Sequence, residues 1–516
     1  MKLAGTLAGA AVLLASFAHG ATITGTVRGP DGAPFRAAYV EARNAKTHST
    51  VIVFSDTQGR YRIPNLSAGD YRVEAHSIGF RSDPMSGIAL TANQDASLDW
   101  NLQKQPVQWT EIPIYMGFQL FPQGKGRSSF VQSCGASCHG FQKMIDLKRD
   151  QNGWKQAVQD MRQRIGGLVI GQVKDGQDAD DLTSYMATIF GSGPGSLPAS
   201  PENMPGYQDW RSQFSDEALK IVYVIYEMPP GRMAWDANPD RNGDVWLPYF
   251  GTVNGVGRLN PNTGELKEYL LPEQNRIATR SATMGKDGTE WVVTESEILI
   301  KLDPKTGKMQ EFKGPAAKGN MNTVRVDPNG ILWISGGPYS YRFDPKSAKF
   351  SEMHDLPATY ACNLDKNGDP WFTEAGGAGR IFKLDYKTGK VSSWTPQTPG
   401  NRRRIQIDPS GAVWFAEYVA GKIGRLDPET GNIEELALPG AEPTPYPVGL
   451  DGENYVWYAS GIMDTVGRMN PTTHQVVEYP PPEVGNGMRE MNNDPQGHMW
   501  FASPGNNTVG YLYLAK

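Results

Sequence analysis

Two cysteines and a histidine lie close together in the segment SCGASCH, residues 133–139. The thiols of Cys134 and Cys138 can add to the two vinyl groups of a haem, and the imidazole of His139 can then reach the iron. The usual spacing has two residues between the cysteines, whereas Gly135, Ala136 and Ser137 make three here, and a bulge must absorb the extra residue. We therefore expect one covalently bound haem c, with His139 as an axial ligand of its iron.

A disulfide between Cys134 and Cys138 is the alternative interpretation, because an exported protein meets an oxidising environment. Zinc is disfavoured, since no other cysteine or histidine lies between His139 and His354 to complete a tetrahedral site. The upstream segment GFQLFPQGKGRSSF, at 117–130, resembles the first helix of small domains of the cytochrome c family. That resemblance implies a haem used for electron transfer.

The sixth iron ligand is expected to be a methionine. The run from Arg149 through Trp154 and Val158 to Met161 resembles mono-haem domains of the same family, in which the methionine of this helix binds iron. The resemblance implies Met161 as the axial ligand, with Met186 as the second choice. A methionine on an apolar helix stripe is otherwise core packing. Ligation by histidine and methionine leaves no open iron position for oxygen, which again favours electron transfer.

Helices must position these residues. Apolar residues recur at helical spacing from Trp154 to Ile165 and from Leu182 to Phe190, and acidic residues stand where the second helix begins. We expect a small helical, cytochrome c-like domain over 108–192. A Gly-, Ser- and Pro-rich linker follows at 193–214.

The first 20 residues predict export. Lys2 precedes an apolar run that ends in small residues, which is typical of a cleaved signal peptide over 1–20 and of a periplasmic or secreted protein. No later segment is apolar enough to predict a membrane span. The net charge of -5 gives no support for nucleic acid as a partner.

Residues 21–105 alternate apolar and polar side chains between Gly, Asp and Asn turns, which predicts a small β-sandwich. The pattern resembles the carboxypeptidase regulatory-like domain, and this resemblance implies a structural or interaction module without catalytic residues. The residues that carry the resemblance are Gly25, Val27, Gly59, Tyr61, Leu66, Gly69 and Tyr71.

From about residue 215 to the end, at 516, the sequence repeats itself. Tryptophans recur every 38 to 45 residues, each after a turn, and this period predicts a seven-bladed β-propeller. The strand at 221–231 lacks a preceding blade and the last blade lacks an outer strand, so we expect the first to complete the last. The tryptophans are Trp246, Trp291, Trp333, Trp371, Trp414, Trp457 and Trp500. The predicted fold class is therefore mainly β, with an N-terminal β-sandwich, a small helical domain and a C-terminal propeller.

The segments at 369–389 and 411–439 carry a resemblance to the virginiamycin B lyase family, the streptogramin-opening enzymes. The resemblance implies the propeller fold and a site with histidines and metal-binding glutamates around the axis. Glu374 and Glu417 match the glutamate-bearing positions and are candidate ligands of a divalent cation, Mg²⁺ or Ca²⁺. The alternative is that each carboxylate pairs with neighbouring backbone or with an arginine.

Counting back from each tryptophan turn identifies the residues at one mouth of the central channel. None is a histidine, and His354, His474 and His498 fall in turns, so the general base of a lyase is missing. Guanidinium and aromatic groups in one place predict a site for an anionic, partly planar small molecule, unless the arginines pair with carboxylates in the channel. The seven predicted residues are Trp235, Arg280, Asn322, Tyr360, Arg403, Tyr446 and Arg489.

These observations favour a periplasmic redox protein. The propeller would bind the substrate, and the haem would exchange electrons with it or with a periplasmic redox partner, as in a haem-dependent oxidoreductase. A metal-dependent carbon–oxygen lyase and a non-catalytic binding propeller are the alternatives. Cys362, on an apolar inner strand, is expected to be a buried structural thiol.

Overall fold

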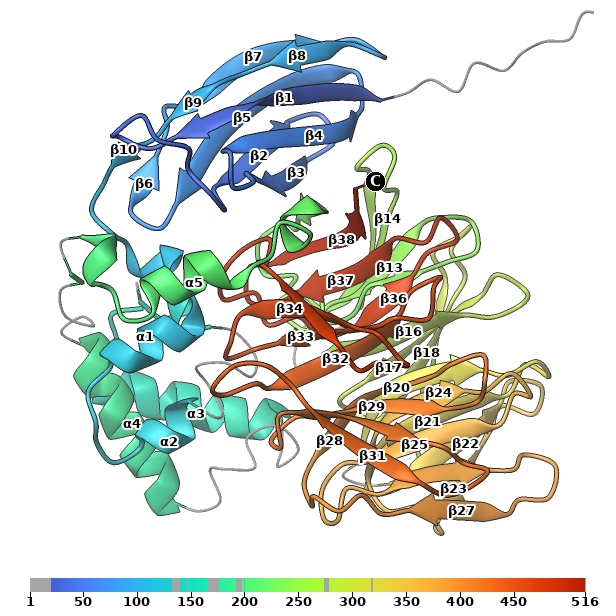
Figure 1. Cartoon of the computed structure of the whole chain (residues 1–516). Coiled ribbons are helices and arrows are strands. Elements are labelled where there is room, and N and C mark those ends of the chain that lie inside the picture. Colours follow the sequence, from blue (N-terminus) through green and yellow to red (C-terminus); the bar gives the residue numbers. More distant parts are fainter. Residues whose placement is uncertain are drawn as a thin grey trace, which may run out of the picture.

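The computed structural model describes residues 20–131, 140–145, 147–165, 176–191, 197–198, 200–272, 278–316 and 319–515, with the backbone alone at 162–165. Residues 1–19 of the predicted signal peptide and the motif residues Cys134, Cys138 and His139 lie outside the described residues. Figure 1 shows the N-terminal strands above a ring of sheets, with the helices along one side of that ring. The predicted mainly β fold class is confirmed.

The N-terminal region consists of two small sheets. One contains β1, β4 and β8, and the other joins β10, β6, β5, β2 and β3. The Tyr61 hydroxyl accepts a hydrogen bond from Trp100 Nε1 (3.0 Å) and donates one to the Leu98 carbonyl (2.6 Å). The strands are β1 (Ala21–Arg28), β2 (Tyr39–Asn44), β3 (Ser49–Phe54), β4 (Arg60–Leu66), β5 (Gly69–Ser77), β6 (Phe80–Arg81), β7 (Met85–Leu90), β8 (Asp95–Ser97), β9 (Trp100–Asn101) and β10 (Gln103–Lys104).

The helical region follows the predicted periodicity. Asp150 Oδ1 accepts the Gly153 N–H (2.8 Å) at the start of α3, and α4 buries its whole apolar face from Leu182 to Phe190. The α-helices are α1 (Ile114–Leu120), α2 (Arg127–Ser129), α3 (Gln151–Ile165), α4 (Gly176–Gly191) and α5 (Tyr207–Gln213). Short 3₁₀ turns occupy η1 (Trp109–Glu111), η3 (Phe141–Lys143), η5 (Pro201–Asn203) and η6 (Ala218–Lys220). Among the described residues, no helix combines the length and the apolar character needed to cross a bilayer.

Six consecutive four-stranded antiparallel sheets form the first blades of the ring. Blades one and two contain β12 (Asn238–Pro239), β13 (Val245–Pro248), β14 (Gly255–Leu259), β15 (Leu266–Leu270), β16 (Thr279–Met284), β17 (Glu290–Thr294), β18 (Ile298–Leu302) and β19 (Met309–Lys313). Blades three and four contain β20 (Asn320–Val326), β21 (Leu332–Gly337), β22 (Ser340–Asp344), β23 (Lys349–Met353), β24 (Thr359–Leu364), β25 (Pro370–Glu374), β26 (Ile381–Leu384) and β27 (Val391–Trp394). Blades five and six contain β28 (Arg402–Ile407), β29 (Val413–Glu417), β30 (Lys422–Leu426), β31 (Ile433–Ala437), β32 (Pro445–Leu450), β33 (Val456–Ser460), β34 (Thr465–Met469) and β35 (Val476–Tyr479).

The seventh blade joins the two ends of the propeller, as predicted. The C-terminal strands β36 (Met491–Asn493), β37 (Met499–Ser503) and β38 (Thr508–Leu514) are completed by β11 (Ile221–Glu227), which pairs with β38 along its whole length. The outer edge of β11 pairs with β3 of the N-terminal region, so one sheet runs through both. The last blade therefore has no free edge on that side.

A hydrogen bond from tryptophan to aspartate fixes six of the seven blade turns. The indole N–H donates to an aspartate six residues earlier at 2.9–3.2 Å, and the same aspartate accepts backbone N–H groups of its own turn. In the second blade Gly285 occupies the aspartate position before Trp291. The six pairs are Trp246–Asp240, Trp333–Asp327, Trp371–Asp365, Trp414–Asp408, Trp457–Asp451 and Trp500–Asp494.

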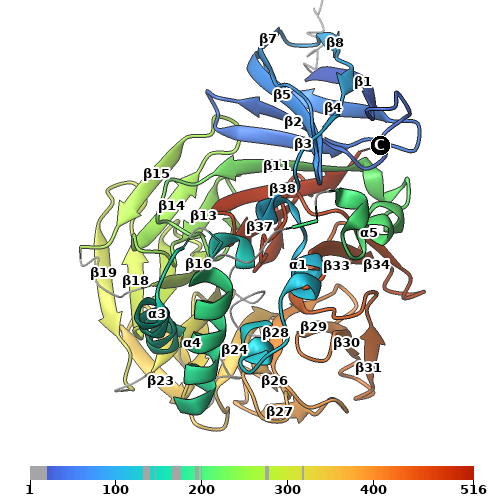
Figure 2. The same cartoon turned by 90° about the vertical axis from the view of Figure 1, so that its left-hand side faces the viewer.

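The helical region covers the face of the ring where the inner strands begin. Figure 2 shows α1, α3 and α4 in front of the ring. At the contact, buried Asp464 Oδ2 accepts the Ile114 N–H of α1 (3.3 Å) and the Gly485 N–H of the seventh blade (2.7 Å). Burial raises the pKa of this carboxyl to about 7.

Candidate ligand site at the propeller axis

The seven residues predicted from the repeat all lie at the start of inner strands, on the side of the helical region, and all are buried. Arg280, Asn322, Tyr360, Arg403 and Tyr446 belong to β16, β20, β24, β28 and β32. Trp235 lies three residues before β12, and Arg489 lies two residues before β36. We call this set the arginine mouth.

Guanidinium groups in the arginine mouth lie over aromatic rings from other blades. The Arg489 guanidinium carbon is 4.1 Å from the Tyr446 ring centroid and 4.8 Å from that of Trp235. Arg403 lies 4.7 Å from Tyr360 and 5.3 Å from Tyr446. The Tyr360 and Tyr446 hydroxyls are hydrogen-bonded. The arginine–ring contacts join neighbouring blades and hold planar cationic groups against planar faces.

The arginines differ in their acidic partners. Arg280 forms an ion pair with Glu295, as the carboxylate-pairing interpretation expects for this residue. Arg489 is 1% exposed, and its Nε and Nη2 have no hydrogen-bond partner among the described residues. A buried guanidinium with unused N–H groups is costly unless an acceptor fills the site. Arg489 is therefore the residue of the mouth best suited to a ligand carboxylate or phosphate.

One step deeper, an ion network bridges the channel. Arg404 contacts Asp236 (2.6 Å) and Glu490 (2.7 Å), and Arg325 contacts Glu490 (3.1 Å). The four side chains come from four different blades, so the network joins blades across the axis. Burial raises the pKa of Asp236 to about 7, although Arg404 opposes this shift.

Sequence reasoning missed this network, although the repeat carried a sign of it. Asp236, Arg404 and Glu490 each directly follow a residue of the arginine mouth. Reading the next position of the same repeat would have found two acids and a base on strands that meet at the axis.

The two glutamates predicted as cation ligands lie at the ends of second strands, each beside an arginine. Glu374 accepts hydrogen bonds from the Arg380 backbone (2.8 Å) and from its guanidinium (2.8 Å), which hold its pKa below the ordinary value against the effect of burial. Glu417 lies 3.2 Å from Arg402, and burial raises its pKa to about 7. Over the described part of the chain, no three His, Cys, Asp or Glu side chains gather as a metal site would require.

The remaining predicted residues lie away from the arginine mouth or at its rim. Cys362 is buried in β24, and burial raises the pKa of its thiol to about 12, so it is an inert structural group. His354, His474 and His498 lie in turns between strands. Met186 is buried in the core of the helical region, whereas Met161 of α3 also packs against the cluster of Trp235 and Phe250.

Comparisons with known proteins agree with this architecture. The virginiamycin B lyase family matches residues 347–515, and the carboxypeptidase regulatory-like domain matches residues 22–103. No curated protein matches the sequence. The chain thus combines a carboxypeptidase regulatory-like domain with a virginiamycin B lyase-like propeller.

Solved structures of lyases share the propeller fold. The Staphylococcus aureus virginiamycin B lyase is 20% identical, with 56% of this chain and 98% of that chain covered and a TM-score of 0.50. A catalytically inactive histidine-to-alanine variant of the same enzyme with quinupristin is 20% identical, with 56% and 99% covered and a TM-score of 0.51. A streptogramin B lyase is 21% identical, with 57% and 98% covered and a TM-score of 0.51. At this identity the comparison establishes the fold.

Proposed function

We propose that this chain is an exported c-type haem protein whose propeller binds an anionic, partly planar small molecule at the arginine mouth. A haem held by the helical region would supply electron transfer between that molecule and a periplasmic redox partner. The observation that carries the proposal is the contact of Met161, the candidate iron ligand, with the cluster of Trp235 and Phe250. Trp235 also lies under the Arg489 guanidinium, so the helical region packs against a residue of the ligand site.

The helical region has groups that fit a haem. Trp154 is buried in α3, and its indole N–H has no acceptor among the described residues. The Arg149 guanidinium carbon lies 5.4 Å from the Trp154 ring centroid. Both side chains can donate to a haem propionate. Gly140, next to His139 in sequence, lies against the propeller, because a Cβ added there would be 3.0 Å from Gly485 Cα.

Cys134 and Cys138 would hold the haem by thioether bonds, and His139 and Met161 would bind its iron. The group would supply one-electron transfer when bound. The propeller residues supply recognition. Arg489 and Arg403 offer N–H groups to an anion. The aromatic rings beside them favour a ligand with a planar shape, and these rings belong to Trp235, Tyr360 and Tyr446.

Binding of planar anions tests the recognition step. Benzoate, phthalate and phenyl phosphate would be titrated against the full chain, with benzyl alcohol as the uncharged comparison, using tryptophan fluorescence and calorimetry. We expect saturable binding of at least one anion and weakening by about 1.5 to 3 kcal/mol in Arg489→Ala, the usual scale for a hydrogen bond to a charged group. Arg489→Lys should recover part of the loss, since it restores the charge without the planar fork.

Arg425→Ala is the matched control. Arg425 also lies over a tryptophan, 5.7 Å from the Trp414 ring centroid, but it pairs with Glu434 at the outside of a blade. Its loss should leave anion binding unchanged. Equal affinities in Arg489→Ala and wild type, or equal weakening in Arg425→Ala, would contradict a specific anion site at the mouth.

A streptogramin lyase is the second candidate, and the match over 347–515 supports it. The related enzyme loses activity when one histidine becomes alanine, and the inner strands here offer Arg, Tyr, Trp and Asn at the mouth. We therefore expect no opening of streptogramin rings. Magnesium-dependent opening that is lost in Glu374→Gln or Glu417→Gln would support the lyase instead.

A further inference from the structure

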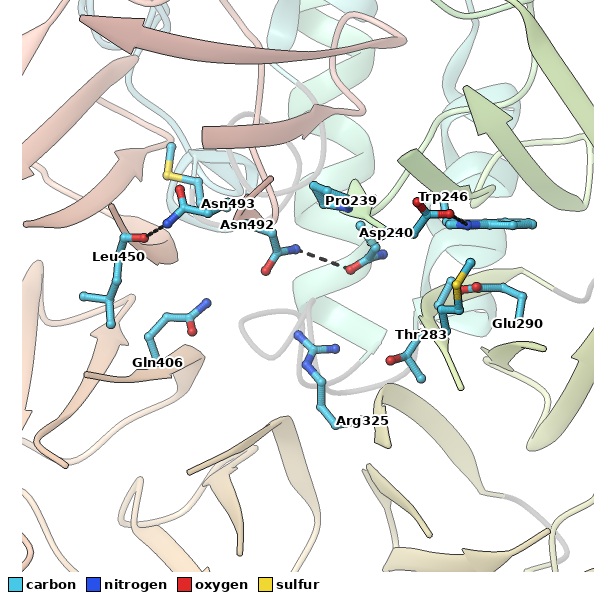
Figure 3. A pocket seen from close by; sticks show the side chains of 14 residues that line it. Pro239, Asp240, Trp246, Thr283, Glu290, Arg325, Gln406, Leu450, Asn492 and Asn493 are labelled. Carbon is cyan, nitrogen blue, oxygen red and sulfur yellow. Dashed lines mark hydrogen bonds between the residues drawn. The ribbon is translucent and has the colours of Figure 1, made fainter. Parts of the chain in front are cut away.

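A second cavity lies at the opposite end of the channel, beyond the ion network. It has a volume of about 350 Å³. Residues of inner strands line it, and they include Asn238, Thr283, Arg325, Gln406 and Asn492. Figure 3 shows the side chains of Thr283, Arg325, Gln406 and Asn492 converging from separate blades. We call this cavity the amide pocket.

Glu290 is the unusual residue of the amide pocket. The residue before the blade tryptophan is apolar in the six other blades, and here it is a carboxyl group with 0% exposure. Neither of its oxygens has a hydrogen-bond partner among the described residues. Burial, together with repulsion from Asp240, raises the pKa of Glu290 well above its ordinary value. The equivalent residues are Val245, Leu332, Pro370, Val413, Val456 and Met499.

A donor without an acceptor lies in the same pocket. Asn238 Oδ1 accepts from Asn492 Nδ2 (3.3 Å), while Asn238 Nδ2 is buried without a partner among the described residues. Arg325 pairs with Glu490 at 3.1 Å, which compensates its charge. Leaving a buried donor and a buried carboxyl unpaired is costly, and a bound polar molecule would remove that cost.

We propose that the amide pocket binds a small neutral polyhydroxylated molecule, of the size of a monosaccharide or disaccharide. Each hydroxyl group both donates and accepts, so one molecule can pair with Glu290, with Asn238 Nδ2 and with the amides around them. A strong anion would approach Glu290 and Asp240, and an organic cation would approach Arg325. Pocket walls that carry both positive and negative charge favour a ligand without net charge.

Sugar binding by the full chain tests the proposal. D-glucose, trehalose and myo-inositol would be titrated by calorimetry and saturation-transfer NMR, at concentrations up to about 10 mM. We expect at least one of them to bind saturably, and we expect Glu290→Gln to weaken it by about tenfold or more. Thr283→Val, which removes a hydroxyl from the pocket wall while keeping the side-chain shape, should also weaken binding. Arg489→Ala, at the other mouth, should leave it unchanged.

Thermal unfolding of each variant would establish that it is folded before its affinity is compared. If Glu290→Gln does not fold, Thr283→Val carries the same comparison. The proposal is overturned if none of the three compounds binds, because water alone would then pair with Glu290 and Asn238 Nδ2. Unchanged affinity in the folded pocket variants overturns it as well.

Discussion

The two ends of one channel differ in chemistry although the same seven inner strands build both. At the end covered by the helical region, guanidinium groups lie over tryptophan and tyrosine rings. At the other end, amides surround a buried carboxyl group, and the arginine there is already paired with Glu490. The first end suits a planar anion and the second a neutral polar molecule.

The repeat therefore fixes where side chains meet but leaves their chemistry open. Successive positions of the inner strand form successive layers along the axis, and each layer in this protein has a different chemistry. The layer of Asp236, Arg404 and Glu490 contains compensating charges and lies between the other two.

Arg404→Met should give the largest effect on this comparison. It leaves Asp236 without its ion-pair partner, while Glu490 keeps only Arg325. Removing one partner of a buried pair is strongly destabilising, so we expect a loss of about 3 to 5 kcal/mol in the free energy of unfolding. Urea denaturation at pH 8, monitored by tryptophan fluorescence, measures this loss of free energy. The loss should be smaller at pH 5, where Asp236 can be protonated.

Arg425→Met is the matched change on the surface. Its partner Glu434 is half-exposed, and ion pairs at the surface contribute less than about 1 kcal/mol. Similar losses in the two variants would contradict a structural role for the bridging network.

Glu290→Gln should give a smaller effect with a definite pH dependence. The pKa of Glu290 is raised in the folded protein, so the fold favours the protonated carboxyl and loses stability as pH rises above the unfolded value. Glutamine has no proton to lose. We expect the variant to melt about 2 to 4 °C above wild type at pH 8, and by a smaller margin at pH 5, in calorimetry without added sugar.

Glu434→Gln provides the control for this measurement, because its carboxylate is half-exposed beside Arg425. It should show no gain at pH 8. A Glu290→Gln variant that is less stable than wild type at both pH values would mean that the carboxyl group has a partner, and the amide pocket would then lose its main argument.

Much of the propeller could be predicted because its period is long and regular. The tryptophan and the aspartate six residues earlier are joined by a hydrogen bond in six blades. Their spacing in the sequence therefore identifies the turn. Counting back from that turn identified seven residues that are all buried at one end of the inner strands. The closing strand β11 was predictable because both ends of the repeat were incomplete.

Other features depend on contacts between segments far apart in sequence. The pairing of β11 with β3 joins two regions, and nothing in either strand indicates its partner. The second blade breaks the repeat at two positions. Gly285 replaces the aspartate of the other blades, and Glu290 replaces their apolar residue. Such a break marks a position, but only the cavity around Glu290 indicates a ligand.

The proposed function requires a covalent haem c in the helical region, beside the arginine mouth. The measurement is the visible absorption spectrum of the full chain, produced in a host that attaches c-type haem, recorded before and after denaturation. Wild type would be compared with the Cys134→Ser and Cys138→Ser double variant. Met161→Ala and Met186→Ala, recorded in the oxidised state, distinguish the two candidate sixth ligands.

The proposed function predicts a Soret band that remains with the denatured polypeptide, gives a c-type pyridine haemochrome and disappears in the double cysteine variant. It also predicts that Met161→Ala, and not Met186→Ala, removes the weak sulfur-to-iron band. A wild-type protein without a Soret band, in which mass spectrometry finds Cys134 and Cys138 joined in a disulfide, would contradict the redox function.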